Sequence, residues 1–255
     1  MDFGLKNRVV LVTGGSAGIG QAAAIAFGRE GAKVVVTYYS NRERAEETAQ
    51  AIIGAGGEAI VVRYDLANDE SIRQTARTTL EKWGTIDVLV NNAVQWGDPA
   101  TIINPPLFED VPAEIWGKFI RTNFEGVYLT IQQVVPAMRK QRWGRIVSLS
   151  SSIAERALPG SAPYAAAKSA LHGLHRALAA ELGRVGVLAN VILPGLTLTD
   201  HVKRVIPEKM REMAAQNTPT GRGSTPEEVA ATIVFLGSAA NGHINGELVR
   251  VNGGL

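Results

Sequence analysis

Tyr164 and Lys168 lie four residues apart in the stretch APYAAAKSAL, residues 162–171, which otherwise consists mostly of alanine. Alanine is the best helix former, so the stretch predicts a helix. Residues four apart share one face of a helix, which places the phenol beside the ammonium group. A phenol can donate a proton, and a neighbouring ammonium group stabilises the phenolate and lowers the phenol pKa from about 10. The alternative is a plain surface pair.

A second group of reactive side chains is the run SLSSS, residues 148–152, at the end of the apolar stretch RIVSLS. In open α/β sheets ligands bind at the carboxyl ends of the strands, so a serine hydroxyl here could hold a substrate oxygen. The serines lack the Gly-x-Ser-x-Gly context of a nucleophilic serine, which disfavours a hydrolase.

A glycine-rich loop, TGGSAGIG at 13–20, connects the apolar run VVLVT with the helical stretch QAAAIAFGRE. Gly14, Gly18 and Gly20 allow a tight turn and a close approach of the backbone to a pyrophosphate. The following helix start offers free N–H groups to the same anion. Because the loop lies after the first strand and before a helix, it predicts a dinucleotide site.

The elements that must position these groups alternate regularly along the chain. Seven short β-branched runs, each followed by a helical stretch, predict strands at 9–13, 33–38, 59–64, 87–91, 145–150, 187–192 and 247–251. Their continuous apolar character is typical of strands buried on both faces of a parallel sheet. The stretch 42–53 has a helical apolar stripe of Ala45, Thr48, Ala49, Ile52 and Ile53, and TPEEV at 225–229 reads as a capping box. We therefore expect a single doubly wound α/β domain, residues 1–255.

Composition excludes several classes of protein. The 255 residues include no cysteine, which excludes disulfides and thiolate chemistry, and the four histidines lack metal-ligand spacing, so no metal site is expected. A net charge of +2 without blocks of like charge does not indicate nucleic-acid binding. No apolar run approaches the roughly 18 residues of a membrane span, and the N-terminus lacks signal-peptide features, so we expect a cytoplasmic protein.

These motifs together resemble the short-chain dehydrogenase/reductase family over essentially the whole chain. TGGSAGIG is similar to the family's TGxxxGxG loop and YAAAK at 164–168 to its YxxxK motif, while NNA at 91–93, PGLTLT at 194–199 and VNGGL at 251–255 occur in the family's order. The resemblance implies a Rossmann fold with NAD(P) as cofactor. It also implies a homo-oligomer, a tetramer or dimer, assembled through the helices of Asn123 and Tyr164.

The resemblance implies four catalytic residues. Tyr164 is the general acid, and Lys168 holds the nicotinamide ribose and tunes the tyrosine. Ser151, thirteen residues before Tyr164, holds the substrate carbonyl, and Asn123 holds a water of the proton relay. All four positions carry the family's residue, which argues against a binding-only relative.

The resemblance also implies a set of cofactor contacts. They are Gly14, Ser16, Gly18, Ile19, Gly20, Ser40, Asn41, Arg42, Asp65, Leu66, Asn92, Ala93, Tyr164, Lys168, Pro194, Gly195, Thr197 and Thr199. Asp65 and Leu66 are expected to line the adenine.

The end of the second strand favours NADP(H) over NAD(H). Tyr38 stands where NAD-preferring enzymes usually have an acid for the ribose 2′-hydroxyl. Ser40, Asn41 and Arg42 follow, and donors with a cation suit a 2′-phosphate. Two points weigh against this: Arg42 could simply face solvent, and Ala17 replaces the basic residue that NADP-binding relatives carry before Gly18.

Two loops are expected to shape the substrate pocket, at about 94–112 and 196–223. Val94 departs from the family's NNAG, and the segment 95–116 is longer than usual and serves either as a pocket wall or as a subunit contact. The segment 201–223 resembles a mobile lid and carries apolar residues suited to an acyl chain.

Three functions stay open from the sequence. The first is NADP(H)-dependent reduction of a ketone, of the 3-oxoacyl or polyketide kind. The second is NAD-dependent oxidation of a sugar or other secondary alcohol, and the third is dinucleotide binding without catalysis. A basic cluster before the fifth strand suggests an acyl carrier protein as a partner, or plain solvation; its members are Arg139, Lys140, Arg142 and Arg145.

Overall fold

The computed structural model describes residues 2–97, 106–156 and 158–255, which form one seven-stranded parallel sheet. Its order is β3-β2-β1-β4-β5-β6-β7. The strands are β1 (Val9–Val12), β2 (Lys33–Tyr38), β3 (Glu58–Arg63), β4 (Val88–Asn91), β5 (Gly144–Leu149), β6 (Val187–Pro194) and β7 (Leu248–Val251). All seven predicted strands are present: β2 has the predicted bounds, and the ends of the others differ from the prediction by at most two residues.

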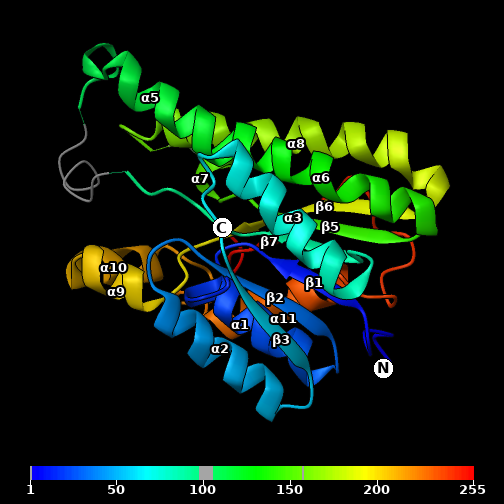
Figure 1. Cartoon of the computed structure of the whole chain (residues 1–255). Helices are drawn as coiled ribbons and strands as arrows, with labels where there is room; N and C mark the ends of the chain where they lie inside the picture. Colours follow the sequence, from blue (N-terminus) through cyan, green and yellow to red (C-terminus); the bar gives the residue numbers. More distant parts are fainter. Residues whose placement is uncertain (1, 98–105, 157) are drawn as a thin grey trace.

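Helices cover both faces of the sheet (Figure 1). One layer holds α1 (Gly18–Arg29), α2 (Arg42–Gly54) and α11 (Pro226–Leu236), and the other holds α3 (Asp69–Trp83), α6 (Gly126–Gln141) and α8 (Ala162–Leu182). Successive side chains of a strand point to opposite faces. Val10 and Val12 accordingly pack with Phe27 in the first layer, while Leu11 packs with Ile72 in the second. The predicted single-domain Rossmann fold is confirmed.

The strand order changes direction at β1. From β1 the chain builds the sheet first toward β2 and β3, and then returns to add β4 on the other side. Open α/β sheets bind their ligands outside the carboxyl ends of the strands at such a switch point. The glycine loop and the NNA motif follow β1 and β4.

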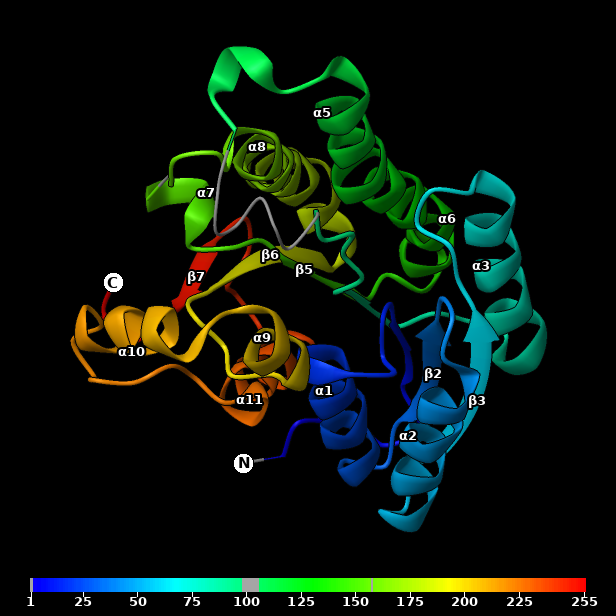
Figure 2. The same cartoon turned by 90° about the vertical axis from the view of Figure 1, so that its left-hand side faces the viewer.

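The remaining short elements gather at the carboxyl edge of the sheet, onto which Figure 2 looks. On one side of the strand ends stand α5 (Ala113–Ile120) and α7 (Ile153–Arg156); on the other stand α9 (Asp200–Val205) and α10 (Glu208–Gln216). Short helical turns are η1 (Phe108–Asp110), η2 (Arg121–Glu125) and η3 (Gly183–Val185). Of the predicted loop at 94–112, residues 98–105 lie outside the described residues. In the part of the chain that is described, no helix has both the length and the apolarity to cross a membrane.

The capping box predicted before α11 is confirmed. Thr225 Oγ1 accepts from the Glu228 amide at 3.3 Å, and Glu228 Oε2 accepts from the Thr225 amide at 2.9 Å. The apolar stripe of α2 is confirmed for Ala45, Thr48, Ala49 and Ile52, but Ile53 is 50% exposed. One residue advances a helix by about 100°, which carries Ile53 off the buried face.

Arg145 was predicted as part of a surface cluster, and this is wrong. It lies in the fully buried strand β5, and only 5% of it is exposed. Its guanidinium donates to backbone carbonyls, including those of Ser238 and Asn241, and stacks over the Trp143 ring at 4.5 Å. Burial lowers its pKa to about 10. Carbonyl oxygens satisfy the charge internally, so Arg145 cannot take part in surface recognition.

Candidate active site

The four predicted catalytic residues come from three segments around the carboxyl edge of the sheet. Ser151 follows β5, Tyr164 and Lys168 lie in the first two turns of α8, and Asn123 lies in η2 between α5 and α6. Helix α8 can start where it does because Pro163 occupies one of its first positions, where no backbone N–H is needed. The alanines that follow let the helix pack closely, and Ala167 is fully buried.

Tyr164 lies among other rings. The indole of Trp96 stacks on it with centroids 5.8 Å apart and planes at 17°, and Phe119 meets it edge-on at 6.3 Å and 84°. Burial raises the pKa of Tyr164 to about 12, while a hydrogen bond with Ser151 acts in the opposite direction. The sequence predicted a phenol pKa lowered by Lys168. In the structure desolvation of the phenolate dominates, and the Lys168 ammonium group is not among the causes of the shift.

Lys168 is almost completely buried, with 3% exposure. Its Nζ donates to the carbonyl of Leu149 at 2.8 Å and lies 5.9 Å from the centroid of the Tyr164 ring. Burial lowers its pKa to about 8. An ammonium group has three donors, and the one bond to Leu149 orients it while further donors stay available to a ligand. The lysine therefore changes charge close to neutral pH.

The serines after β5 have different surroundings. Ser150 is buried, and its hydroxyl donates to the Lys168 carbonyl at 3.1 Å and pairs with His172 Nε2 at 2.9 Å. Ser151 is half-buried, and its Oγ accepts from the Ile153 amide at 3.2 Å. The hydroxyl proton of Ser151 is therefore free to be donated to a ligand or to Tyr164. This supports Ser151 rather than Ser150 as the substrate-binding serine.

Asn123 lies in a π-helical turn, a departure from α-helix that occurs often at functional sites. The residue is fully buried. Its amide forms a reciprocal pair with the backbone of Gln95: Oδ1 accepts from the Gln95 amide at 3.0 Å, and Nδ2 donates to the Gln95 carbonyl at 3.1 Å. Asn123 thus fixes the loop after β4, which carries Trp96. Its place in a proton relay stays a prediction.

The glycine loop forms a cradle for an anion. Gly14 and Gly18 have φ of 66° and 57°, the left-handed region that favours glycine. The N-cap of α1, Ala17, offers no side chain to the first N–H groups, and the first turn has no acidic residue. Ser16 precedes this cap and Ile19 lies in the first turn. The free N–H groups and the positive helix end therefore fit a pyrophosphate.

The NNA motif braces this cradle from the neighbouring strand. Asn92 Nδ2 donates to the carbonyls of Thr13 and Gly14 at 3.0 and 3.1 Å, and the Ala93 amide donates to Thr13 Oγ1 at 3.0 Å. A Cβ on Gly20 would lie 2.3 Å from the Gly14 carbonyl oxygen and 2.4 Å from Asn92 Nδ2. The cradle has no space for any side chain at position 20.

We expect Gly20→Ala to weaken NADPH binding by at least about tenfold, because the added methyl group must displace the Gly14 carbonyl or the Asn92 amide. A fluorescence titration with NADPH measures this. Gly117→Ala is the control, since a Cβ there meets nothing within 4 Å. Unchanged NADPH affinity in a folded Gly20→Ala protein would contradict the assigned cradle.

The segment after β6 lies against the cradle, as the sequence predicted. A Cβ on Gly18 would lie 3.1 Å from Thr199 Cγ2, and Thr199 Oγ1 caps α9 by accepting from the Val202 amide at 3.2 Å. Thr197 is buried and bridges to Ser224 in β-fashion. Pro194 ends β6, and a Cβ on the next residue, Gly195, would lie 3.0 Å from Asn252 Cα. The predicted PGLTLT segment thus reaches the glycine cradle at Thr199.

The residues predicted to bind the adenine and the 2′-phosphate have fewer contacts with the rest of the site. Asp65 Oδ1 accepts from the Ala67 amide at 2.9 Å, and Leu66 is buried among the residues of the α3 layer. Ser40 is exposed, and Asn41 caps α2 by accepting from the Arg44 amide at 3.0 Å. The proposed adenine and phosphate contacts at these positions stay predictions.

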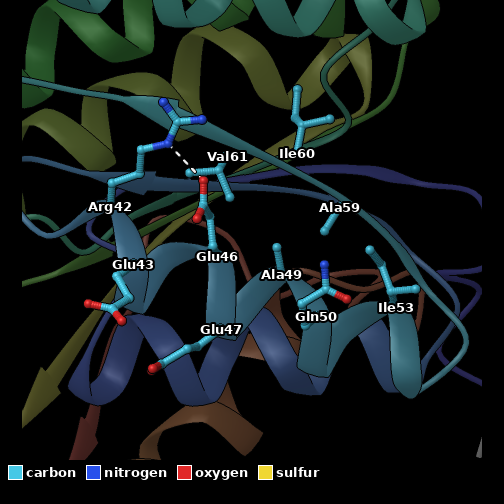
Figure 3. Close-up of a pocket in the computed structure, with 10 residues that line it drawn as sticks. All are labelled: Arg42, Glu43, Glu46, Glu47, Ala49, Gln50, Ile53, Ala59, Ile60 and Val61. Carbon is cyan, nitrogen blue, oxygen red and sulfur yellow. Dashed lines mark hydrogen bonds and ion pairs between the residues drawn. The ribbon is translucent and has the colours of Figure 1, made fainter.

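Arg42 turns toward its own helix. Its Nε donates to Glu46 Oε1 at 2.7 Å, and Figure 3 shows the pair in a surface groove between α2 and the edge strand β3, beside Ala59, Ile60 and Val61. The sequence did not single out Arg44, whose Nη2 lies 3.6 Å from Asp200 Oδ2 at the start of α9. Arg44 thus connects the end of β2 with the segment after β6.

Three aromatic residues at the site were also missed as functional groups. They are Trp96, Phe119 and His201, and no motif of the sequence marks them. In the structure His201 stacks on Trp96 with centroids 5.6 Å apart and planes at 25°. Within the described ranges, no group of three or more His, Asp or Glu side chains is arranged to hold a metal.

Comparison with known proteins gives matches along almost the entire chain. A family model described as enoyl-(acyl carrier protein) reductase matches residues 14–255. A 3-oxoacyl-[acyl-carrier-protein] reductase of Synechocystis is 38% identical over 252 residues, 98% of each chain, and one of Thermotoga maritima is 34% identical over 251 residues, again 98% of each.

Solved structures match equally well. A 7α-hydroxysteroid dehydrogenase complexed with NADH and 7-oxo glycochenodeoxycholic acid has a TM-score of 0.92 at 32% identity, covering 99% of this chain and 96% of that one. A mutant of a Serratia marcescens short-chain dehydrogenase/reductase has a TM-score of 0.89 at 30% identity, with 98% of each chain covered.

Proposed function

The chain belongs to the short-chain dehydrogenase/reductase family of NAD(P)-dependent oxidoreductases, and from this premise we propose that it reduces a ketone to a secondary alcohol with NADPH. The observation that carries the proposal is the convergence of Tyr164, Lys168 and Ser151 at the sheet edge that also holds the glycine cradle. Such a convergence serves catalysis and is not needed for dinucleotide binding alone.

The chain's own groups act on the carbonyl oxygen. When bound, the nicotinamide supplies a hydride to the carbonyl carbon. Ser151 donates its hydroxyl hydrogen to the carbonyl oxygen and orients it, and Tyr164 donates the proton that the oxygen takes up as its charge develops. The Lys168 ammonium, held by the Leu149 carbonyl, then stabilises the phenolate. It also holds the nicotinamide ribose.

The protonation state of Tyr164 fits the role of a proton donor. With its pKa raised to about 12, Tyr164 carries a proton at neutral pH and can give it to an alkoxide. Oxidation of an alcohol needs the phenolate instead, which burial disfavours.

The substrate that we propose is a 3-oxoacyl thioester or a related ketone. The support is the identity of 31–38% with curated 3-oxoacyl-[acyl-carrier-protein] reductases along almost the whole chain. An acyl carrier protein as partner has weaker support, because Arg145 is buried and Arg139 pairs with Glu181. The test is oxidation of NADPH by purified protein with a 3-oxoacyl thioester; no turnover with any 3-oxoacyl compound would contradict the proposal.

For the cofactor, we expect the protein to bind NADPH more tightly than NADH, and Arg42→Gln to weaken NADPH binding about tenfold without changing NADH binding. The reason is a charge-assisted bond from the guanidinium to the 2′-phosphate. Fluorescence titrations with both dinucleotides measure the effect.

Two further variants test whether Arg42 or a neighbouring residue contacts the 2′-phosphate. Glu46→Gln removes the carboxylate that Arg42 binds and should tighten NADPH binding, and Arg44→Gln tests the neighbouring cation. If only Arg44→Gln loses NADPH affinity, the phosphate contact belongs to Arg44. If wild-type protein prefers NADH, the NADP assignment is wrong.

The second candidate is an NAD-dependent dehydrogenase of a secondary alcohol. It is favoured by the structural likeness to a hydroxysteroid dehydrogenase solved with NADH. NAD reduction by sugars and sterols, compared with NADPH oxidation by ketones under the same conditions, separates the two candidates.

We also propose a homo-oligomer assembled through the α5–α6 and α8 helices. Exposed apolar side chains on this face support it: Ile115 and Trp116 on α5 and Tyr128 on α6 are 42–50% exposed. Sedimentation equilibrium tests it, and a monomer at assay concentrations would contradict it.

A further inference from the structure

Four aromatic rings gather above the strand ends. Trp96 stacks on Tyr164 and on His201, with centroids 5.8 and 5.6 Å apart, and Phe119 meets Tyr164 edge-on. These rings come from four segments: the loop after β4, α5, α8 and α9. The proposed reaction uses only Tyr164, so three of the four rings have no part in it.

Trp96 is the member that links the others. It lies in the loop after β4, one residue beyond Gln95, whose backbone is held on both sides by the amide of Asn123. The backbone beneath the indole is therefore fixed by a buried side chain. As a residue Trp96 is 47% exposed, although its indole stacks on two rings. A large, positioned and half-exposed aromatic surface beside the general acid is suited to contact a substrate.

The stacking determines which chemical group suits this surface. Offset-stacked aromatic pairs gain stabilisation beyond their buried area, and the gain needs a flat ring on the partner. A saturated chain or ring gains only the free energy of burying its apolar surface. A wall made of Trp96 and His201 therefore distinguishes flat groups from puckered groups of the same size.

We propose that Trp96 and His201 form a substrate subsite that selects ketones with an aromatic ring or another flat conjugated group attached to the carbonyl. This inference rests on the proposed function, because it takes the ketone to be reduced at Tyr164. It narrows the substrate from any 3-oxoacyl compound to one whose carbon 3 carries a flat group.

The arrangement requires α9 to shift when the ring enters. At 5.6 Å between centroids and 25° between planes, Trp96 and His201 leave no space for a third ring between them. Helix α9 has six residues, and its charged connection to α2 is the exposed pair Arg44–Asp200. The shift breaks the Trp96–His201 stack and the exposed Arg44–Asp200 pair; the stack of the substrate ring on Trp96 replaces the first, and exposed ion pairs contribute little to stability.

The test uses two ketones that differ only in flatness: ethyl 3-oxo-3-phenylpropanoate and ethyl 3-cyclohexyl-3-oxopropanoate, both with NADPH. The quantity of interest is the ratio of their kcat/KM values in each variant. The intrinsic difference in carbonyl reactivity is the same for every variant, so it cancels when the variants are compared. Wild type is compared with Trp96→Leu and His201→Leu, and the control is Trp116→Leu, a tryptophan of similar exposure on α5.

We expect Trp96→Leu to lower the phenyl-to-cyclohexyl ratio about three- to tenfold, mainly through KM for the phenyl ketone. His201→Leu should lower it in the same direction, and Trp116→Leu should keep the wild-type ratio. Trp96→Phe keeps a flat ring and should restore most of the preference, which distinguishes stacking from mere loss of bulk.

Three other results would overturn either the subsite or the proposed function. Equal ratios in wild type and Trp96→Leu, with both ketones reduced, would overturn the subsite and leave the proposed function intact. If the wild type reduces neither of the two ketones and no 3-oxoacyl thioester, the proposed function itself is overturned. A lower ratio in Trp116→Leu as well would mean that the effect is not specific to the stack, which would also overturn the subsite.

Discussion

Tyr164→Phe should lower kcat for ketone reduction by about two to four orders of magnitude and leave NADPH affinity within about twofold of wild type. The substitution removes one oxygen atom and keeps the ring, so the contacts with Trp96 and Phe119 persist. What is lost is the proton donor, and the neighbouring hydroxyl that acts on the pKa of the Tyr164 phenol is that of Ser151. A serine hydroxyl is a far weaker acid than a phenol and cannot replace it.

The matched control for this variant is Tyr64→Phe. Tyr64 is also a buried phenol; it directly follows β3, and its hydroxyl pairs with Thr130 Oγ1 of α6 at 2.6 Å. Its loss should lower stability by about 1 kcal/mol and leave kcat unchanged. Steady-state kinetics and NADPH titration of both variants measure the contrast. Turnover by Tyr164→Phe at the wild-type rate would remove Tyr164 as the general acid.

The second large effect concerns Lys168. Lys168→Met should lower kcat/KM for NADPH by about two orders of magnitude, because it removes the ammonium group that we assign to the nicotinamide ribose and to the phenolate. Methionine has a similar length and suits the buried position, where burial already disfavours a charge. Thermal unfolding should therefore change little, although the Leu149 carbonyl loses its 2.8 Å donor.

The pH dependence of the wild type follows from the same group. Burial lowers the pKa of Lys168 to about 8, so the ammonium form is present below that pH and is lost above it. Since kcat/KM reports ionisations of the free enzyme, kcat/KM for NADPH should fall as pH rises through about 8. In Lys168→Met this fall should disappear. A profile that stays flat to pH 9 in the wild type, or an identical fall in the variant, would contradict the assignment.

The fold could be predicted because local signals agreed with one another. Continuous apolar runs such as VVLVT and KVVVTY indicated buried parallel strands, and strands β1 and β2 lie where these runs are. The capping box at Thr225 depends on residues three apart, and such short-range geometry is readable from sequence.

The catalytic residues could be placed by their order along a parallel sheet. Strands that all run in the same direction bring the residues that follow them to one edge, so the segments after β1, β4, β5 and β6 had to converge. The predicted sites at Gly14, Asn92, Ser151 and Thr199 are at that edge for this reason.

Properties that depend on distant packing could not be predicted. The pKa of Tyr164 is raised by burial beside Trp96 and Phe119, which are 68 and 45 residues away in the sequence. Arg145 looked like a surface cation because its acceptors, the Ser238 and Asn241 carbonyls, belong to a remote loop. Arg42 pairs within its own helix, a choice between neighbouring partners that the sequence leaves open.

The most direct test of the account follows a label from the cofactor to the product. NADPH carrying two deuterium atoms at carbon 4 of the nicotinamide is incubated with a 3-oxoacyl thioester, and the product is analysed by mass spectrometry. We predict an alcohol with one deuterium at carbon 3 from the wild type, and almost none formed in the same time by Tyr164→Phe, although this variant binds the labelled NADPH. An unlabelled alcohol, or labelled alcohol formed equally fast by the variant, would contradict the account.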